Sequence, residues 1–241
     1  MLLRVLIKIK KNIKLYKMYK NKNALVLLSG GQDSTTCLYW ALKNFKTVTA
    51  IGFDYGQMHI NELDAAAKIA KNVGVDYIVK DVKGLMAHSS LTDHTNHNES
   101  SYIDSTLPAS FTAGRNIIFL SIAASYAAEN GINDIITGVC QTDYSGYPDC
   151  RRTSISALET TISLSYGAGD FRIHTPLMYI NKAETWKLAK DLGCIDVIIN
   201  DTVTDYNGST EFNEWGYGTL DTPSSKLRAE GYNRAKRLGW L

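Results

Sequence analysis

The feature that most constrains the fold is an octet of glycine and hydroxyl residues that directly follows a short apolar run. The apolar run covers residues 24–28 and contains no polar position, which is typical of a parallel strand covered by helices on both faces. The octet, Ser-Gly-Gly-Gln-Asp-Ser-Thr-Thr, spans residues 29–36. Glycines let the backbone approach a ligand closely, and amides at the start of the next helix point toward a bound anion. The octet therefore predicts a phosphate cradle between a strand and a helix.

Strand-like and helix-like segments alternate along the rest of the chain. The predicted strands are residues 24–28, 46–53, 75–79, 134–137 and 171–174, and the predicted helices are residues 34–44, 61–73, 116–129, 153–164 and 182–192. This alternation indicates an α/β protein with an open, mostly parallel sheet and helices on both faces. Polar stretches over residues 84–110 and 205–225 predict long loops, and such loops often contribute to binding sites.

Basic residues are unevenly distributed. Residues 1–22 hold eight of the 26 Lys and Arg residues and no acid, so the remaining body has 18 basic residues against 24 acidic ones. A body of this charge is not expected to bind nucleic acid.

We expect the chain to have three parts. These are a basic N-terminal extension over residues 1–22, of which residues 1–17 are optional, an α/β nucleotide-binding domain over residues 23–200, and a small, loop-rich C-terminal lobe over residues 201–241.

The cysteines and the apolar runs indicate in which cellular compartment the protein is found. Cys37, Cys140, Cys150 and Cys194 form no C-x-x-C pair, and a chain of this length needs no disulfide staples. We therefore expect reduced thiols and a cytoplasmic protein. No apolar run reaches the roughly 18–20 residues that span a bilayer, so we expect no membrane association.

Three further polar segments are predicted to meet the octet. Residues 53–57 follow the second strand, residues 114–116 open the long helix, and residues 138–151 follow the fourth strand. Ligands of open α/β sheets bind outside the carboxyl ends of the strands, so these segments converge on one crevice.

The octet lacks the Gly-Lys-Ser/Thr ending of the Walker loop, whose lysine reaches the outer phosphates, and this disfavours transfer of the γ-phosphoryl group.

The octet resembles the S-G-G-x-D-S motif of the PP-loop ATP pyrophosphatases. With residues 53–57, 114–116, 138–151, 175–177 and 181–186 added, the chain resembles the 7-cyano-7-deazaguanine synthase family from about Ala24 to Tyr232. The resemblance implies a Rossmann-like, adenine nucleotide α-hydrolase-like fold. It also implies an ATP- and Mg²⁺-dependent ligase that adenylates 7-carboxy-7-deazaguanine, uses ammonia, and forms the nitrile in queuosine biosynthesis as a homodimer.

The resemblance also implies roles for single residues. The expected nucleotide contacts are Ser29, Gly30, Gly31, Gln32, Asp33, Ser34, Thr35, Phe53, Asp54, Gly114, Arg115 and Gly138. The expected catalytic residues are Asp33, Ser34, Arg115 and Lys182. Charge that develops on the leaving pyrophosphate needs preorganised partners, which these residues would supply. For Lys182, a solvated lysine at the start of a helix, without a catalytic role, is an equally good interpretation. The expected substrate contacts are Tyr55, Gln57, Asp143, Tyr144, Tyr147 and Asp149, whose carboxylates suit N–H donors and whose rings suit stacking on a heterocycle.

The chain departs from the family at a zinc element. Family members carry four cysteines around Tyr-Asn-Gly and Leu-Arg flanks, which survive here as residues 206–208 and 227–228. The four ligand positions hold Asp205, Thr219, Thr222 and Ser225. Hydroxyls are poor replacements for the thiolates that structural Zn²⁺ prefers. We therefore expect no zinc, and a loop held by side-chain hydrogen bonds and by packing of Trp215 and Tyr217.

Two alternatives stay open. A diverged paralogue would stop at the amide, or would adenylate a different substrate with another amine donor. A nucleotide-binding regulatory subunit would bind without catalysis, but Asp33 and Arg115 weigh against it, because a binder needs no machinery for a leaving pyrophosphate.

Overall fold

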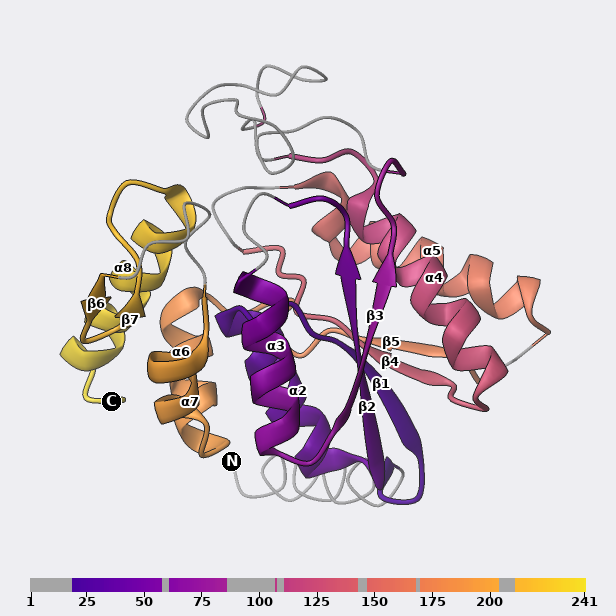
Figure 1. Ribbon diagram of the computed structural model, residues 1–241, viewed down its shortest axis with the longest axis horizontal. Coiled ribbons are helices and arrows are strands. Elements are labelled where there is room, and N and C mark those ends of the chain that lie inside the picture. Colours follow the sequence, from indigo (N-terminus) through magenta and orange to yellow (C-terminus); the bar gives the residue numbers. More distant parts are fainter. Residues whose placement is uncertain are drawn as a thin grey trace, which may run out of the picture.

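The computed structural model describes residues 19–57, 61–85, 107, 111–142, 147–167, 170–203 and 211–241. Its centre is a five-stranded sheet with the order β3-β2-β1-β4-β5, in which every neighbouring pair is parallel (Figure 1). The strands are β1 (Asn23–Leu27), β2 (Thr47–Asp54), β3 (Asp76–Asp81), β4 (Asp134–Ile136) and β5 (Arg172–His174). The parallel sheet confirms the predicted α/β class. Each predicted strand and helix is present within two residues of its expected ends.

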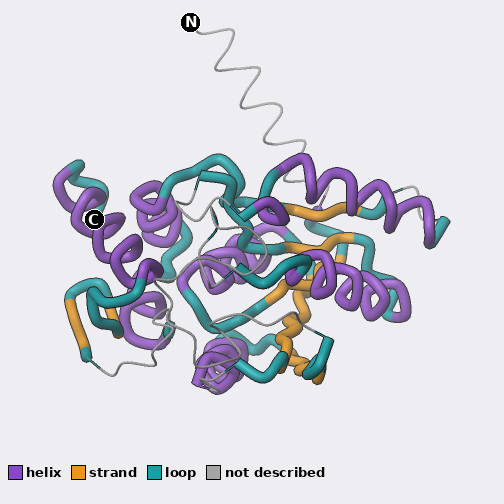
Figure 2. The backbone as a smooth tube through the Cα atoms, turned by 90° about the horizontal axis from the view of Figure 1, so that it is seen from above, coloured by secondary structure: helices purple, strands orange, loops and turns teal. Residues whose placement is uncertain are grey.

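Helices cover both faces of this sheet. On one face lie α2 (Gln32–Asn44) and α3 (Asn61–Asn72), and on the other lie α4 (Arg115–Glu129) and α5 (Arg152–Ser165), which follows the short 3₁₀ helix η1 (Pro148–Cys150) (Figure 1). Helices α6 (Lys182–Asp191) and α7 (Ile195–Asp201) lie beside α2 and α3, at the end of the molecule opposite α4 and α5 (Figures 1 and 2). Among the described residues, every helix is too short or too polar to span a bilayer.

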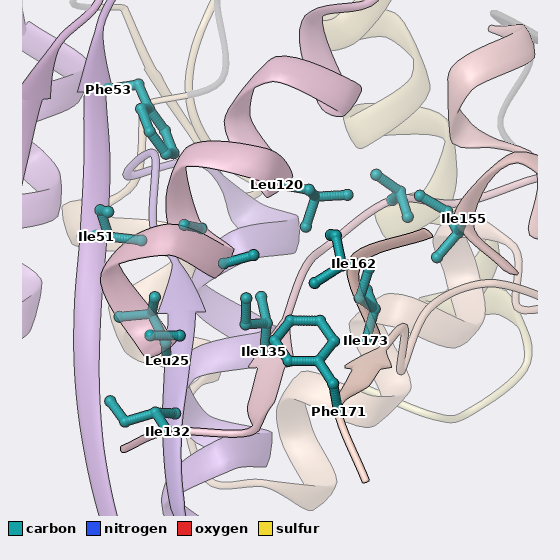
Figure 3. Packing of buried hydrophobic residues seen from close by; sticks show 14 of the residues in the cluster. Leu25, Ile51, Phe53, Leu120, Ile132, Ile135, Ile155, Ile162, Phe171 and Ile173 are labelled. Carbon is teal, nitrogen blue, oxygen red and sulfur yellow. The ribbon is translucent and has the colours of Figure 1, made fainter. Parts of the chain in front are cut away.

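The strands divide their side chains between two cores. Leu25, Ile51 and Ile135 pack under α4 and α5 together with Leu120 and Ile155 (Figure 3). The alternate positions Ala24, Val26 and Ala50 pack under α2 and α3. Successive residues of a strand point to opposite faces, which is why an uninterrupted apolar run suits a strand buried on both sides.

The C-terminal part differs from the expected loop over residues 205–225. Two short strands, β6 (Phe212–Asn213) and β7 (Gly216–Tyr217), form a hairpin there, and helix α8 (Pro223–Arg237) begins inside the expected loop. Thr222 caps α8 and Pro223 occupies its first position, as helix starts favour. Sequence patterning missed α8 because its residues are mostly polar.

The expected domain boundaries also differ from the packing. A third core joins α6, α7 and α8 through Trp186, Ile198 and Ala229, so residue 200 does not separate two cores. At the other end, Tyr19 and Lys22 belong to the expected extension but pack on the α/β body. Residues 1–18 and most of the expected loop over residues 84–110 lie outside the described residues.

Candidate functional site

The glycine loop lies between β1 and α2 at the carboxyl edge of the sheet. Gly30 has a φ of +84°, and a Cβ on it would lie 2.3 Å from the carbonyl oxygen of Glu62, so only glycine fits against α3. Gly31 is the N-cap of α2, which leaves the first amides of the helix without intrahelical acceptors. Gly138 follows β4, and a Cβ on it would lie 3.1 Å from the backbone carbon of Asp33. The segments after β1 and β4 therefore meet, as expected.

Hydroxyl groups hold the loop in shape. The Ser34 Oγ lies 3.1 Å from the Ser29 Oγ, accepts from the Ser29 amide at 3.2 Å, and lies 3.2 Å from the Gly31 carbonyl, to which it can donate. Two other polar side chains of the loop, Gln32 and Thr35, are buried without a hydrogen-bond partner in the structure. Orphaned buried polar groups are costly in a chain alone, so this segment suits a site that binds a polar ligand.

Lys182 reaches the loop from α6. Its Nζ lies 2.8 Å and 3.0 Å from the two carboxylate oxygens of Asp33, and its side chain is only 10% exposed. A capping box of Asn181 and Glu184 fixes the start of α6. The stem of Lys182 packs on Gly231 of α8, where a Cβ would lie 2.7 Å from the lysine Cγ. The alternative of a solvated lysine is therefore wrong.

The segment after β2 is held by its own side chains. The Asp54 carboxylate pairs with Lys83 at 2.6 Å and accepts from the Gly56 amide, and the hydrogen bond from Lys83 lowers the pKa of Asp54. Gln57 folds back, accepting from the Tyr55 amide at 3.0 Å and donating to the Phe53 carbonyl at 3.3 Å. The Phe53 ring is buried and stacks on Phe119, so it forms part of the core. The Asp54 carboxylate and the Gln57 amide are therefore used within this segment, and Tyr55 is the residue of the turn whose polar side-chain group these contacts leave out.

Arg115 and Tyr55 meet at the carboxyl end of β2. Gly114, with a φ of +70°, precedes Arg115 at the start of α4. The positive charge of Arg115 acts on the Tyr55 hydroxyl and on the Glu62 carboxyl, from the first turn of α3, and in each case favours the ionised form. Burial raises the pKa of Tyr55 to about 12 and the pKa of Glu62 to about 7. The first turn of α3, which holds Glu62, also lies against Gly30 through its backbone carbonyl.

The expected substrate contacts after β4 are placed only in part. The buried Asp149 accepts from the Asn116 amide at 3.1 Å and from its side chain at 3.0 Å, so it clamps the start of α4. The Tyr147 ring lies 5.5 Å from Phe111. Asp143 and Tyr144 lie outside the described residues.

The residues at the family's zinc positions do not fit zinc. The Thr222 Oγ1 accepts from the Ser225 amide as the cap of α8, and the buried Ser225 Oγ has no hydrogen-bond partner in the structure. Within the described ranges no group of three or more His, Cys, Asp and Glu side chains is placed to hold a metal ion, and Asp205 lies outside those ranges. The fully buried Arg228 donates to the carbonyls of Trp215 at 2.9 Å and Ile198 at 2.7 Å.

Sequence reasoning missed Glu62 and Arg228. Glu62 shares a helix face with Ala66, Ile69 and Val73. A carboxylate on an otherwise apolar helix face is the sequence signal that could have identified it. In the sequence, Arg228 stands out only as part of the Leu-Arg flank at residues 227–228. No sequence pattern distinguishes it from the other arginines of α8, because its burial comes from α7 and the β6–β7 hairpin.

Known proteins resemble this chain over most of its length. The family model described as "Queuosine biosynthesis protein QueC" matches residues 23–236. A 7-cyano-7-deazaguanine synthase of Phocaeicola vulgatus is 49% identical over 88% of this chain and 93% of its own length, and one of Clostridium acetobutylicum is 48% identical over 90% and 96%. A solved 4-thiouridine synthetase–RNA complex with bound ATP is 19% identical, with a TM-score of 0.49 over 88% of this chain and 53% of that one. The chain therefore belongs to the queuosine biosynthesis protein QueC family.

Proposed function

We propose that this chain is an ATP-dependent C–N ligase that converts 7-carboxy-7-deazaguanine and ammonia into 7-cyano-7-deazaguanine in queuosine biosynthesis. The observation that carries the proposal is the glycine loop with Lys182 fixed at it by Asp33. A cation close to helix amides that lack intrahelical acceptors can bind a polyphosphate and stabilise the charge that its leaving group gains during the reaction. Family membership supports the identity of the acid and of the product.

The first half of the reaction makes an amide. The substrate carboxylate attacks the α-phosphorus of ATP, the bond to the bridging oxygen breaks, and pyrophosphate leaves with the electron pair. Lys182 and the amides that follow Gly31 would stabilise this leaving group, and Arg115 would stabilise charge on the α-phosphate. Ammonia then attacks the acyl carbon, a proton is lost from nitrogen, and AMP leaves.

The second half makes the nitrile at the same site. The amide oxygen attacks a second ATP and again releases pyrophosphate. Loss of the remaining N–H protons and cleavage of the C–O bond then expel AMP and leave the C≡N group. The reaction consumes two ATP in total, so the glycine loop must bind and release nucleotide twice in each cycle.

Magnesium would enter with the nucleotide. Mg²⁺ is usually held by substrate phosphates and one or two carboxylates, and Asp33 is the carboxylate that the structure places at the loop. The ion would neutralise charge on the phosphates. The carboxylate's contact with Lys182 means that the two cations would share Asp33.

The proposed partners follow from the resemblance and the composition. We expect a homodimer that uses free ammonia and binds no nucleic acid, consistent with the acidic body of the chain. All four cysteines are free thiols, which supports a reducing, cytoplasmic environment.

The decisive assay supplies ATP, Mg²⁺, ammonium and 7-carboxy-7-deazaguanine, and follows pyrophosphate and product mass. Nitrile with two pyrophosphates per product supports the proposal. Amide with one pyrophosphate supports the diverged variant that stops early. No pyrophosphate that depends on the acid contradicts both and leaves a different substrate or a regulatory subunit.

A further inference from the structure

Helix α8 carries a buried glycine, Gly231, near its middle. Glycine is the poorest helix former after proline, so a glycine inside a helix needs a reason. Gly231 lies away from both ends of α8, so it is not a cap, and its φ is not positive, so its backbone conformation does not require glycine. The reason must therefore lie in what packs against it.

The neighbour of Gly231 is the start of α6. A Cβ on Gly231 would lie 2.7 Å from the Cγ of Lys182, 2.9 Å from its Cβ and 3.0 Å from its backbone carbon. Each distance is well below the about 3.5–4.0 Å at which carbon atoms pack. Because one of the three atoms belongs to the backbone, the lysine cannot clear the clash by rotating its side chain alone. The two helices thus approach more closely here than any side chain at position 231 permits.

Further contacts fix α8 on α6 at this point. Trp186, which follows Lys182 by one helical turn, is fully buried, and its Nε1 donates to the Arg228 carbonyl at 3.1 Å. The Arg228 guanidinium lies 5.7 Å from the centre of the Trp186 ring, and the ring of Tyr232 lies 5.1 Å from it. Arg228 and Tyr232 stand on either side of Gly231 in the sequence. The close approach at Gly231 is therefore held by contacts before and after it.

Lys182 is restrained along its whole length. The side chain of Asn181 caps α6 and fixes its first turn, Gly231 packs along the lysine stem, and the carboxylate of Asp33 pairs with Nζ at 2.8 Å and 3.0 Å. A free lysine has a flexible four-carbon stem and samples many positions. A charge contributes most to catalysis when it is already in place, because nothing then has to reorganise as the transition state forms.

We propose that Gly231 is a positioning residue for Lys182. Because it has no side chain, it lets α8 pack against the lysine stem and direct the ammonium group to the glycine loop. The inference rests on the proposed function in taking Lys182 to act on the leaving pyrophosphate. Helix α8 then affects the rate of the reaction through this lysine.

Gly231→Ala tests the proposal by steady-state pyrophosphate release. The added methyl group displaces the lysine stem, so we expect kcat to fall about tenfold or more with a nearly unchanged KM for the acid substrate. In Lys182→Met the same change should lower kcat no further, because no ammonium group is left to misplace. Ala235→Gly, in the same helix and the same core, is the matched control, and it should lower Tm but keep kcat.

A second measurement does not depend on catalysis. Competitive acetylation followed by mass spectrometry compares the amine of Lys182, whose side chain is 10% exposed, with that of Lys187, which is 44% exposed in the same helix. We expect Lys182 to react several-fold more slowly in the natural chain. This protection should be lost in Gly231→Ala and kept in Ala235→Gly.

Three results overturn the inference: losses of kcat that multiply in the double variant, an unchanged kcat in Gly231→Ala, or protection of Lys182 that survives there. If Gly231→Ala does not fold, Trp186→Phe takes its place with the same readouts and a smaller expected loss, since it removes the N–H donated to the Arg228 carbonyl. If the natural chain releases no pyrophosphate that depends on the acid, the proposed function fails instead. The acetylation result then still decides whether Gly231 places Lys182.

Discussion

At the scale of single residues, Lys182 joins two parts of the molecule. Its stem packs on Gly231 of α8 and its ammonium group pairs with Asp33 at the start of α2. The Asp33 carboxylate is about 29% exposed, so solvent screens part of this interaction and it contributes modestly to stability. Its larger effect is geometric, because it places a cation where helix amides already favour an anion.

Lys182→Met tests this geometry. Methionine keeps much of the packing on Gly231 and removes the charge, so we expect kcat to fall by roughly 10²–10³-fold, as for loss of one preorganised donor, with a small change in Tm. Lys187→Met, on the exposed side of the same helix, is the control and should keep its activity. Equal losses in the two variants would contradict the role of Lys182. The measurement is steady-state pyrophosphate release.

Gly138→Ala tests the contact between the segments after β1 and β4. The new Cβ would press on the backbone of Asp33 and Ser34, at 3.1 Å and 3.2 Å, and backbone atoms yield less easily than side-chain ends. We expect the KM for ATP to rise about tenfold or more, because a small misplacement of binding groups is costly. Gly74→Ala should destabilise by about 1 kcal/mol through its positive φ and leave this KM unchanged. An unchanged KM in Gly138→Ala would contradict the predicted contact.

At the scale of elements, the C-terminal hairpin and α8 are joined by a buried cation. Arg228 donates to carbonyls of α7 and of the segment before β7, and lies 5.7 Å from the Trp186 ring. Burial lowers the pKa of Arg228 to about 10, which still leaves it charged at neutral pH. Hydrogen bonds from one guanidinium thus connect α8 to α7 and to the β6–β7 hairpin.

Metal analysis and chelation test whether this part folds without zinc. Because its hydroxyls are poor zinc ligands, we expect less than stoichiometric zinc in the purified protein and an unchanged Tm in excess EDTA. Removing Arg228 with Arg228→Met should lower stability by about 3 kcal/mol, since two buried carbonyls lose a charged donor. Stoichiometric zinc, or a large fall in Tm with EDTA, would contradict the expectation. Inductively coupled plasma mass spectrometry and calorimetry supply the two measurements.

At the scale of the whole molecule, local patterns predicted the sheet but not how distant segments combine. The apolar run at residues 24–28 and the octet that follows fixed the first strand, the loop and the start of α2, because their chemistry is local. The meeting of the segments after β1 and β4 followed from the rule that loops of parallel sheets gather at the carboxyl ends of the strands. The attraction between the charges of Glu62 and Arg115, the burial of Arg228 and the helix α8 did not follow, since each depends on tertiary packing that has no periodic signal. Asp149 suited a ligand by type, yet the fold uses it to hold α4.

The N-terminal boundary gives the last prediction. Tyr19 packs on Phe45 and His174, each with ring centroids 5.1 Å apart, and Lys22 pairs with Asp134 at 3.2 Å. Asp134 is 1% exposed and also contacts His174 at 2.7 Å, so removal of Lys22 leaves a buried carboxylate with one partner fewer. A chain that starts at Met18 keeps these contacts, whereas one that starts at Asn23 loses them.

We therefore expect the chain from Met18 to match the full chain in Tm and activity. The chain from Asn23 should lose about 2–4 kcal/mol, which lowers Tm by roughly 5–15 °C for a protein of this size. Its kcat at low temperature should stay the same, because Asp134 begins β4 and the glycine loop lies at the other edge of the sheet. Differential scanning fluorimetry and the pyrophosphate assay measure both. Equal Tm values for the two truncated chains would show that residues 19–22 add nothing to the stability of the fold. A lower kcat with an unchanged Tm in the chain from Asn23 would instead show that these residues act in the candidate site.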